Sequence, residues 1–311
     1  MEDLDIIAIG ELLIDFTPEG EGSDGFPVIA AHPGGSVANY LAAAAARGAK
    51  TALCAKVGDD AFGKLLVNAV KECGVDTSHI VLTDEAFTTL AFVTLDANGE
   101  RDFSFSRKPG ADTLLQKEDL DADLLEHTKV LHFSTVGMTD EPSRSAHKYF
   151  IEEAREKGVI LSFDPNLREP LWRDLEDAKE QMFWGLERAD VVKISDNEVE
   201  FLTGETAEAG GRILFDKYRP QIMFVTCGAS GCRYYFAGGD YFIAAPAGVH
   251  PVDTTGAGDI FGGTAMAAVV SSGKAPGELG REELDEITAL ACTAASLSTE
   301  RPGGISSIIR R

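Results

Sequence analysis

Short apolar runs that alternate with helical patterns dominate the middle of this chain. The strand-like runs cover residues 130–138, 159–166 and 190–195, and helical patterns end near Gly158 and span about Asp177–Arg188. Strands that alternate with helices in this way form parallel sheets, because each right-handed crossover between neighbouring strands uses the intervening helix. The pattern therefore predicts an α/β fold with a mostly parallel central sheet.

Two hairpin patterns interrupt this alternation. Leu90–Leu95 and Arg101–Ser106 flank Asn98-Gly99, a dipeptide that favours the two-residue turns of β-hairpins. A second hairpin pattern covers residues 232–245 around Gly238-Gly239. A chain of 311 residues could hold two domains, but parallel α/β folds often use that length for one core. We expect one large domain with a small β appendage around the first hairpin.

The N-terminal region carries its own strand and helix signals. The apolar run Ile6–Phe16 is interrupted by Gly10 and predicts a buried strand, with Asp15 where that strand emerges. From Gly34 onward a run of small residues predicts a helix that packs closely on the sheet and ends at Gly48.

Charge and composition exclude several classes of partner. The chain has 51 acidic and 28 basic residues, a formal net charge of −23, and no cluster of Lys or Arg. Nucleic acids and anionic membranes are therefore poor candidates, because both need a basic surface. The N-terminus lacks the pattern of a signal peptide, so we expect a cytoplasmic protein. The five cysteines are odd in number and scattered, which favours buried free thiols.

The glycine-rich segment 253–259, with the sequence DTTGAGD, carries the strongest chemical signal. It precedes an apolar helical pattern, so the amides of Gly256, Ala257 and Gly258 would point from a helix N-terminus toward an anion. Asp259, in the first turn, could accept a proton from an attacking hydroxyl. The alternative is a glycine turn without chemistry, in which Asp259 is an ordinary acidic residue of a first helical turn.

Two common nucleotide-binding motifs are absent from the sequence. No GxxxxGK[ST] motif occurs, because Gly63-Lys64 and Gly273-Lys274 are each followed by a residue other than Ser or Thr. The run around Gly256 also lacks the GxGxxG spacing of dinucleotide-binding folds, and it does not follow the first strand. A kinase with this sequence must therefore bind phosphate in another way.

The combination of PGGSVAN at 33–39, VGDDAFG at 57–63 and DTTGAGD at 253–259 resembles both signatures of the ribokinase-like, or pfkB-type, kinase family. The resemblance extends from GELLIDF at Gly10 to the RPGGISS segment near the C-terminus. It implies a three-layer αβα sandwich in a single kinase domain, 1–311, with a small β-sheet lid from about 11–33 and 88–110. The implied activity is ATP-dependent phosphorylation of a sugar.

The family resemblance also implies roles for individual residues. Asp259 matches the catalytic base, and Gly256, Ala257 and Gly258 match the anion hole. The positions that match sugar contacts are Asp15, Gly34, Gly35, Asn39, Arg107 and Arg168. Carboxylate and amide groups suit polyols, which both donate and accept hydrogen bonds. As alternatives, these residues could form a strand end, a turn, a helix cap or structural ion pairs.

The nucleotide and metal positions follow from the same resemblance, and ATP and Mg²⁺ are the implied cofactors. Lys193, Thr226, Gly228 and Gly231 match nucleotide contacts, and Glu198 matches the magnesium shell. Ser195 replaces the asparagine that usually begins the NxxE element, which weakens a phosphate contact at position 195. A loop for K⁺ or another monovalent cation would comprise Asp253, Thr255, Ser298, Arg301, Gly303 and Ser307.

Within the family the sequence looks most like the fructokinases, which implies transfer of the γ-phosphate of ATP to D-fructose. Arg107 and Arg168 also match 2-keto-3-deoxygluconate kinases, whose substrate carboxylate suits a guanidinium, so that alternative stays open. Leu13 stands where ribokinase has a polar contact, which argues against ribose. A non-catalytic sugar-sensing protein is the alternative from another class. Relatives pair their lids between subunits, so a homodimer through the lid is expected.

Overall fold

A ten-stranded, mostly parallel sheet runs through the middle of the computed structural model, which describes residues 3–95 and 101–308. Neighbouring strands pair in parallel except at one edge, where two antiparallel pairs end the sheet. The predicted α/β fold is confirmed. Across the sheet within the described residues, the strands are β14 (Gly239–Ala244), β13 (Gly231–Phe236), β12 (Ile222–Thr226), β11 (Val191–Ser195), β10 (Ile160–Asp164), β9 (Thr128–Ser134), β1 (Leu4–Ile9), β4 (Thr51–Gly58) and β5 (Val75–Asp76), with β6 (Ile80–Thr83) beside β4.

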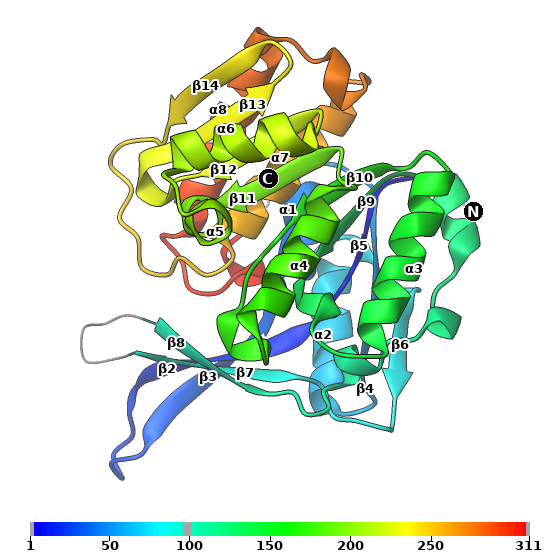
Figure 1. Cartoon of the computed structure of the whole chain (residues 1–311). Coiled ribbons are helices and arrows are strands. Elements are labelled where there is room, and N and C mark those ends of the chain that lie inside the picture. Colours follow the sequence, from blue (N-terminus) through cyan, green and yellow to red (C-terminus); the bar gives the residue numbers. More distant parts are fainter. Residues whose placement is uncertain (1–2, 96–100, 309–311) are drawn as a thin grey trace.

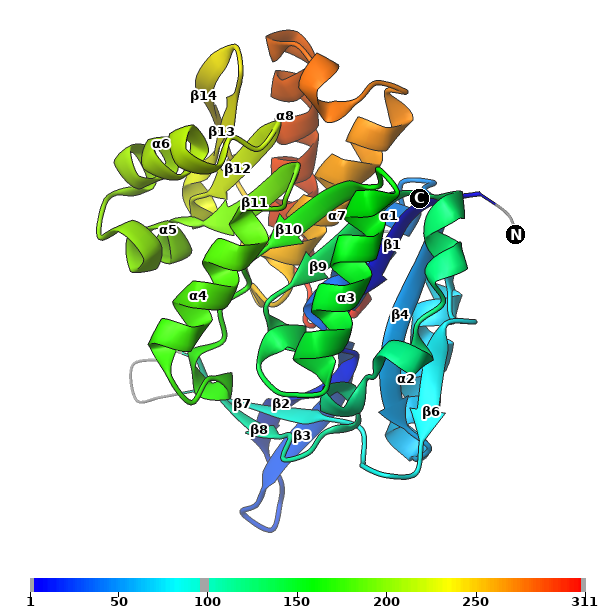
Figure 2. The same cartoon turned by 45° about the vertical axis from the view of Figure 1, so that its right-hand side comes forward.

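Helices cover both faces of this sheet, which gives the predicted three layers. Alternate residues of β1 point to opposite faces: Ile6 and Ala8 pack in one buried cluster, and Ile7 and Ile9 in the other. Figure 2 shows α3 and α4 in front of the sheet and α7 and α8 behind it. The helices are α1 (Ser36–Ala45), α2 (Ala61–Glu72), α7 (Ala257–Ser271) and α8 (Arg281–Ser298) on the first face, and α3 (Ser143–Glu156), α4 (Leu175–Leu186), α5 (Asp196–Thr203) and α6 (Ala207–Tyr218) on the second.

A second, four-stranded sheet lies apart from these layers (Figure 1). Its order among the described residues is β3 (Pro27–Gly34), β2 (Leu13–Glu21), β7 (Leu90–Leu95) and β8 (Arg101–Ser106). The strands β7 and β8 pair antiparallel, as the first hairpin pattern predicts, while the Asn98-Gly99 turn lies outside the described residues. The single strand expected over Ile6–Phe16 is wrong, because the chain leaves β1 at Gly10 and begins β2 in the other sheet.

A carboxylate attaches the small sheet to the body. Asp60 caps α2 by accepting hydrogen bonds from the amides of Phe62 and Gly63, at 2.9 and 2.8 Å. It also accepts a 2.7 Å hydrogen bond from the amide of Thr88, just before β7. The central residue of the VGDDAFG segment therefore joins a helix N-terminus to the base of the small sheet.

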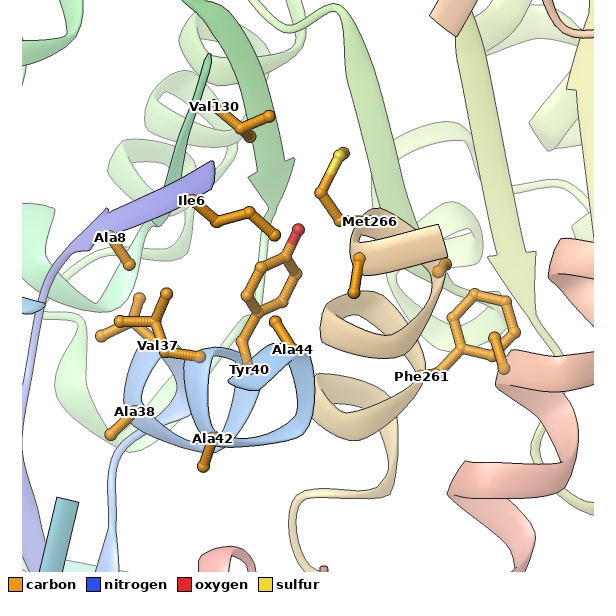
Figure 3. Packing of buried hydrophobic residues seen from close by; sticks show 14 of the residues in the cluster. Ile6, Ala8, Val37, Ala38, Tyr40, Ala42, Ala44, Val130, Phe261 and Met266 are labelled. Atoms are coloured by element: carbon orange, nitrogen blue, oxygen red, sulfur yellow. The ribbon is translucent and has the colours of Figure 1, made fainter. Parts of the chain in front are cut away.

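The helices α1 and α7 pack against each other at unusually close range. A Cβ atom added at Gly263 would overlap the carbonyl oxygen of Tyr40, and one at Gly262 would lie 2.9 Å from the Tyr40 ring. Tyr40 points from α1 toward the strands, between Ile6 and Met266 (Figure 3). Its ring stacks on that of His132 with centroids 3.5 Å apart. The small residues that predict close packing of α1 are therefore matched by glycines in α7.

The remaining local predictions agree closely with the structure. The hairpin around Gly238-Gly239 is present as β13 and β14. The helix after Gly34 spans Ser36–Ala45, and Gly48 takes the left-handed conformation, with φ 90°, just after it. Cys54, Cys232 and Cys292 are buried thiols, as predicted, whereas Cys73 and Cys227 are only half-buried. Among the described helices, none is long and apolar enough to cross a membrane.

Replacing Gly263 by Ala tests the close packing of α1 on α7. Alanine favours a helix by about 1 kcal/mol over glycine, but its methyl group would overlap the Tyr40 carbonyl oxygen. We expect the overlap to dominate and the free energy of unfolding in urea to fall by about 2 kcal/mol. An unchanged or increased stability would show that the two helices can separate without cost.

Candidate active site

Two cavities meet at the N-terminus of α7. The first, of 690 Å³, lies where β1 and β10 end and is lined partly by the small sheet, while the second, of 460 Å³, lies between α7, α8 and the antiparallel edge. Thr254 lines both cavities. Gly256 and Asp259 line the first, and Ala257 and Gly258 line the second. Parallel α/β sheets bind ligands at the carboxyl ends of their strands, so this boundary is the natural place for chemistry.

The turn that begins α7 has the conformation expected of an anion site. Gly256 has φ 74°, a left-handed value that favours glycine. The first amides of a helix lack intrahelical acceptors, and the helix dipole adds partial positive charge there. The Ala257 amide makes a long, 3.3 Å hydrogen bond to the carbonyl oxygen of Thr254. The turn can therefore present backbone donors to an anion in the second cavity.

Two asparagine amides hold the carboxylate of Asp259. Asn39 of α1 donates to Oδ2 at 2.9 Å, and Asn166, which follows β10, donates to Oδ1 at 3.1 Å. Burial raises the pKa of Asp259, and the nearby Lys193 ammonium and the Asn39 hydrogen bond partly oppose this rise. A carboxylate that is buried, oriented and more basic than usual is suited to accept a proton.

The predicted sugar residues at the start of α1 lie together. Asp15 is buried, and the burial raises its pKa to about 7 despite the opposing charge of Arg168. A Cβ atom at Gly34 would overlap the Asp15 carboxylate, and one at Gly35, where φ is 115°, would overlap the carbonyl oxygen of Glu11. Both glycines thus leave room for carboxylate and backbone oxygens at the edge of the first cavity.

The two predicted arginines differ in their surroundings. Arg168 lines the first cavity, and its guanidinium donates to the carbonyl oxygen of Leu167 at 3.1 Å. Arg107 does not line that cavity, although it donates to the carbonyl oxygen of Val136, which does, so its contact with a sugar stays a prediction. Its buried guanidinium pairs with Asp112 at 2.7 Å and donates to Thr139 at 2.6 Å. A buried charge needs such partners, and Asp112 is only five residues away.

Two residues of the first cavity escape prediction from the sequence. Asn166 takes a left-handed conformation, with φ 48°, which asparagine tolerates better than most residues. Its place in the DPN turn after a strand was the only available signal. Glu11 is 2% exposed, and its Oε1 accepts hydrogen bonds from the amide and hydroxyl of Ser36 at 2.5 and 2.6 Å. Its Oε2 has no hydrogen-bond partner among the described residues.

The predicted nucleotide residues occupy the second cavity, with one exception. Thr226, Gly228 and Gly231 line it, and the two glycines have left-handed φ values of 51° and 129°. Lys193 is not part of the lining. Its Nζ lies against Gly258 and donates to Asp164 at 2.9 Å. The lysine therefore lies behind the anion-binding turn rather than in the open cavity.

Glu198 and Ser195 form a capping box at the start of α5. The Ser195 hydroxyl accepts a 3.3 Å hydrogen bond from the Glu198 amide, and Glu198 Oε2 accepts one from the Ser195 amide at 2.8 Å. Oε1 of Glu198 accepts a 2.7 Å hydrogen bond from the amide of Leu167. Serine is a preferred cap, so its presence at position 195 preserves the helix start. The role of Glu198 in a magnesium shell stays a prediction.

The residues of the predicted monovalent-cation loop come together only in part. Asp253 accepts hydrogen bonds from the amides of Thr255 and Gly303, at 2.7 and 2.8 Å, and so joins two segments 50 residues apart. The hydroxyls of Ser298 and Ser307 donate to nearby carbonyl oxygens. Arg301 lines a separate hollow. Within the described ranges no three His, Cys, Asp or Glu side chains gather as metal ligands. A monovalent-cation loop would use mainly backbone carbonyls, and it stays a prediction.

Comparison with protein families decides the class to which this site belongs. The family described as "pfkB family carbohydrate kinase" matches residues 3–311. The chain belongs to this family. The predicted enzyme class, a carbohydrate kinase, is therefore confirmed.

Relatives of this carbohydrate kinase are similar over nearly the whole chain. It is 39% identical to "Fructokinase-1" of Zea mays over 97% of this chain and 94% of the relative. It is also 39% identical to "Fructokinase-2" of Solanum lycopersicum over 96% and 92% of the two chains.

Solved structures of bacterial fructokinases share the fold. That of Xylella fastidiosa with bound ATP gives a TM-score of 0.89 at 29% identity, over 98% of this chain and 94% of that one. That of Vibrio cholerae O395 in a form with fructose, ADP and calcium ion gives 0.87 at 29% identity, over 98% and 96%. The predicted ribokinase-like fold is confirmed.

The raised pKa of Asp15 in this kinase gives a testable dependence of stability on pH. Because the folded pKa, about 7, exceeds the ordinary 3.8, the folded state favours the protonated form. The Asp15 carboxyl therefore contributes stability that is fully present below pH 3.8 and is lost as the pH rises through 7. The free energy of unfolding of Asp15→Asn relative to wild type should therefore increase by on the order of 3 kcal/mol from about pH 4 to about pH 7.

Asp60→Asn is the matched control, and unfolding in urea gives the free energy of unfolding of both variants and of wild type. Burial acts to raise the pKa of Asp60, but hydrogen bonds from Thr88 and Gly63 outweigh it and lower the pKa. The Asp60 contribution to stability is present above pH 3.8 and is lost only as the pH falls below that value, so the Asp60→Asn difference should stay nearly constant between pH 4 and 7. A difference between Asp15→Asn and wild type that does not change with pH would contradict the account of Asp15.

Proposed function

We propose that this chain is an ATP-dependent fructokinase that transfers the γ-phosphate to D-fructose and forms fructose 6-phosphate. Support comes from the named relatives, which are fructokinases similar over nearly their full length. Among the solved structures of similar fold, one fructokinase holds ATP and another holds fructose and ADP. Fructose would occupy the first cavity, and the nucleotide would occupy the second.

One observation carries the proposal: Asp259 lines one cavity, while Ala257 and Gly258 of the anion-binding turn line the other. An acceptor hydroxyl beside the Asp259 carboxylate would face a phosphate held by the turn. A base and an anion site at one boundary suit the transfer of a group from a ligand in one cavity to a ligand in the other.

The mechanism follows from this arrangement. The primary hydroxyl of the sugar attacks the γ-phosphorus in line with the leaving oxygen, and Asp259 accepts the hydroxyl proton. Backbone amides of Gly256, Ala257 and Gly258 stabilise the charge that develops on the phosphate oxygens. Asp15 and Asn39 orient the sugar. The Asp15 carboxylate accepts hydrogen bonds from sugar hydroxyls, and the Asn39 amide can both donate and accept them.

Magnesium is the divalent ion we propose for the nucleotide. Mg²⁺ is usually held by phosphates, waters and one or two carboxylates, so the absence of a larger ligand cluster among the described residues fits it. Glu198 would contact the ion through water, because each of its carboxylate oxygens already accepts a hydrogen bond from a backbone amide. When bound, the ion would neutralise phosphate charge. The loop closed by Asp253 and Gly303 would hold K⁺ or a similar cation, with backbone carbonyls as ligands.

The small sheet is proposed as a lid over the sugar. Leu13 and Phe105 from this sheet line the first cavity, so its position controls access of water to the bound sugar. Exclusion of water limits wasteful hydrolysis of ATP. The edge strand β3 exposes Val28 and Ile29, at 45% and 48%, and Phe26 nearby is 72% exposed. These apolar side chains on an open edge support a homodimer through the lid.

A 2-keto-3-deoxygluconate kinase is the second candidate. Arg168 lines the first cavity, where a substrate carboxylate could pair with its guanidinium. Arg107 gives this candidate no further support, because Asp112 and Thr139 already engage its guanidinium.

A coupled assay of ADP release with a panel of sugars tests the substrate. Fructose, 2-keto-3-deoxygluconate, ribose, tagatose and adenosine should be compared at equal ATP and Mg²⁺. We expect fructose to give the highest kcat/KM, because the named relatives are fructokinases. A higher value for the keto acid would overturn the choice of fructose. Binding of sugars without any turnover would favour the sugar-sensing alternative.

Replacing Asp259 by Asn tests the proposed base. The amide has nearly the same shape but cannot accept the hydroxyl proton, so kcat should fall by roughly 10²- to 10⁴-fold. Sugar affinity, measured by calorimetry, should stay within several-fold of wild type, since Asp15 and Asn39 still hold the sugar. Turnover near that of wild type would sink the assignment of Asp259 as the base.

A further inference from the structure

A buried carboxylate outside both cavities contacts the two groups that flank the candidate base. Asp164, at the end of β10, is 2% exposed and lines neither cavity. Its Oδ1 accepts a 3.1 Å hydrogen bond from the amide of Asn166. Its Oδ2 accepts a 2.9 Å hydrogen bond from Nζ of Lys193 on β11. A ligand in either cavity therefore cannot account for the position of this charge.

Each partner of Asp164 touches a different part of the α7 N-terminus. Asn166 donates its side-chain amide to Asp259 Oδ1 at 3.1 Å, and Lys193 Nζ lies against Gly258. Asn166 is held in a left-handed conformation, and the Asp164 contact with its amide closes that turn. The network thus extends from one buried carboxylate to both the base and the anion-binding turn.

We propose that Asp164 is a positioning residue that acts through Asn166 and Lys193 to orient Asp259 and to place a positive charge behind the anion-binding turn. This inference rests on the proposed function, in which Asp259 is the base. Asp164 touches no reacting atom, so it affects the rate of transfer more than the affinity for sugar. Asn166 fixes the carboxylate from the side opposite to Asn39, and loss of either contact lets Asp259 rotate.

Removal of the Asp164 charge should lower turnover through its two partners. Asp164→Asn keeps the shape of the side chain but replaces the carboxylate that pairs with the Lys193 ammonium by a neutral amide. Because Lys193 and Asn166 would then be held less firmly, we expect kcat to fall roughly 10- to 100-fold. The sugar KM should stay within several-fold of wild type, because Asp164 does not line the cavity. Asp119→Asn is the matched control, since it removes the partner of another buried lysine, Lys56, and should leave kcat unchanged.

A double-mutant cycle tests whether Asp164 acts through Asn166. Asn166→Gly removes the side-chain amide but keeps the left-handed backbone accessible. If the proposal holds, Asp164→Asn will cost a much smaller factor in the Asn166→Gly background than in the wild-type background. Equal factors in both backgrounds, or near-wild-type kcat for Asp164→Asn, would overturn it. Urea unfolding of each variant separates these effects from a loss of folded protein.

Titration of Asp259 gives a readout that does not depend on turnover. Asn166→Asp preserves shape and backbone conformation but places a second carboxylate about 3 Å from Asp259 Oδ1, so the Asp259 carboxyl pKa, followed by NMR, should rise by about one unit or more. The acid limb of the kcat profile should move upward with it. An unmoved pKa would refute the contact. The charged groups that face Asp259 and stay constant in this comparison are Lys193, Arg168, Glu11, Asp15 and Asp164.

Failure of the proposed function would look different from failure of this inference. If the wild-type protein phosphorylated no sugar, the fructokinase assignment would be wrong. The NMR titration would still show whether Asn166 holds Asp259. Wild-type turnover with fructose, together with an unmoved pKa in Asn166→Asp, would keep the function and remove the positioning role.

Discussion

The close contact between α1 and α7 sets the geometry on which the site depends. Gly263 lets the Tyr40 carbonyl oxygen approach the α7 backbone, and the same pair of helices brings Asn39 within hydrogen-bond distance of Asp259. Because α7 begins between the two cavities, this packing also decides where its first amides point. A residue larger than glycine at the contact would therefore move the base and the anion site together.

Electrostatics at the site balances burial against a few fixed partners. Burial raises the pKa values of Asp15, Asp164 and Asp259, while Lys193 and Arg168 offset part of that cost. Carboxylates so close together would be unfavourable in a protein selected for stability alone. Their arrangement makes sense when a sugar replaces water and one carboxylate must accept a proton.

Backbone constraints explain what could be predicted from the sequence. Gly34, Gly35 and Gly256 occupy positions where a Cβ would clash or where φ is positive, so their pattern carried the site signal. The alternation of strands and helices likewise carried the parallel sheet. Tertiary proximity explains what could not be predicted: Asn166 and Asp259 are 93 residues apart, and only the folded chain shows their hydrogen bond. The ion pair between Arg107 and Asp112 likewise could not be read from the sequence, although the two residues are only five positions apart.

The most direct test of the account is a crystal structure with fructose and a non-hydrolysable ATP analogue bound together. We expect the primary hydroxyl of fructose to lie within hydrogen-bond distance of an Asp259 carboxylate oxygen, and the terminal phosphate to lie against the amides of residues 256–258. We also expect the adenosine to lie in the cavity lined by Thr226 and Gly228. A sugar hydroxyl turned away from Asp259, or a nucleotide bound outside that cavity, would contradict it.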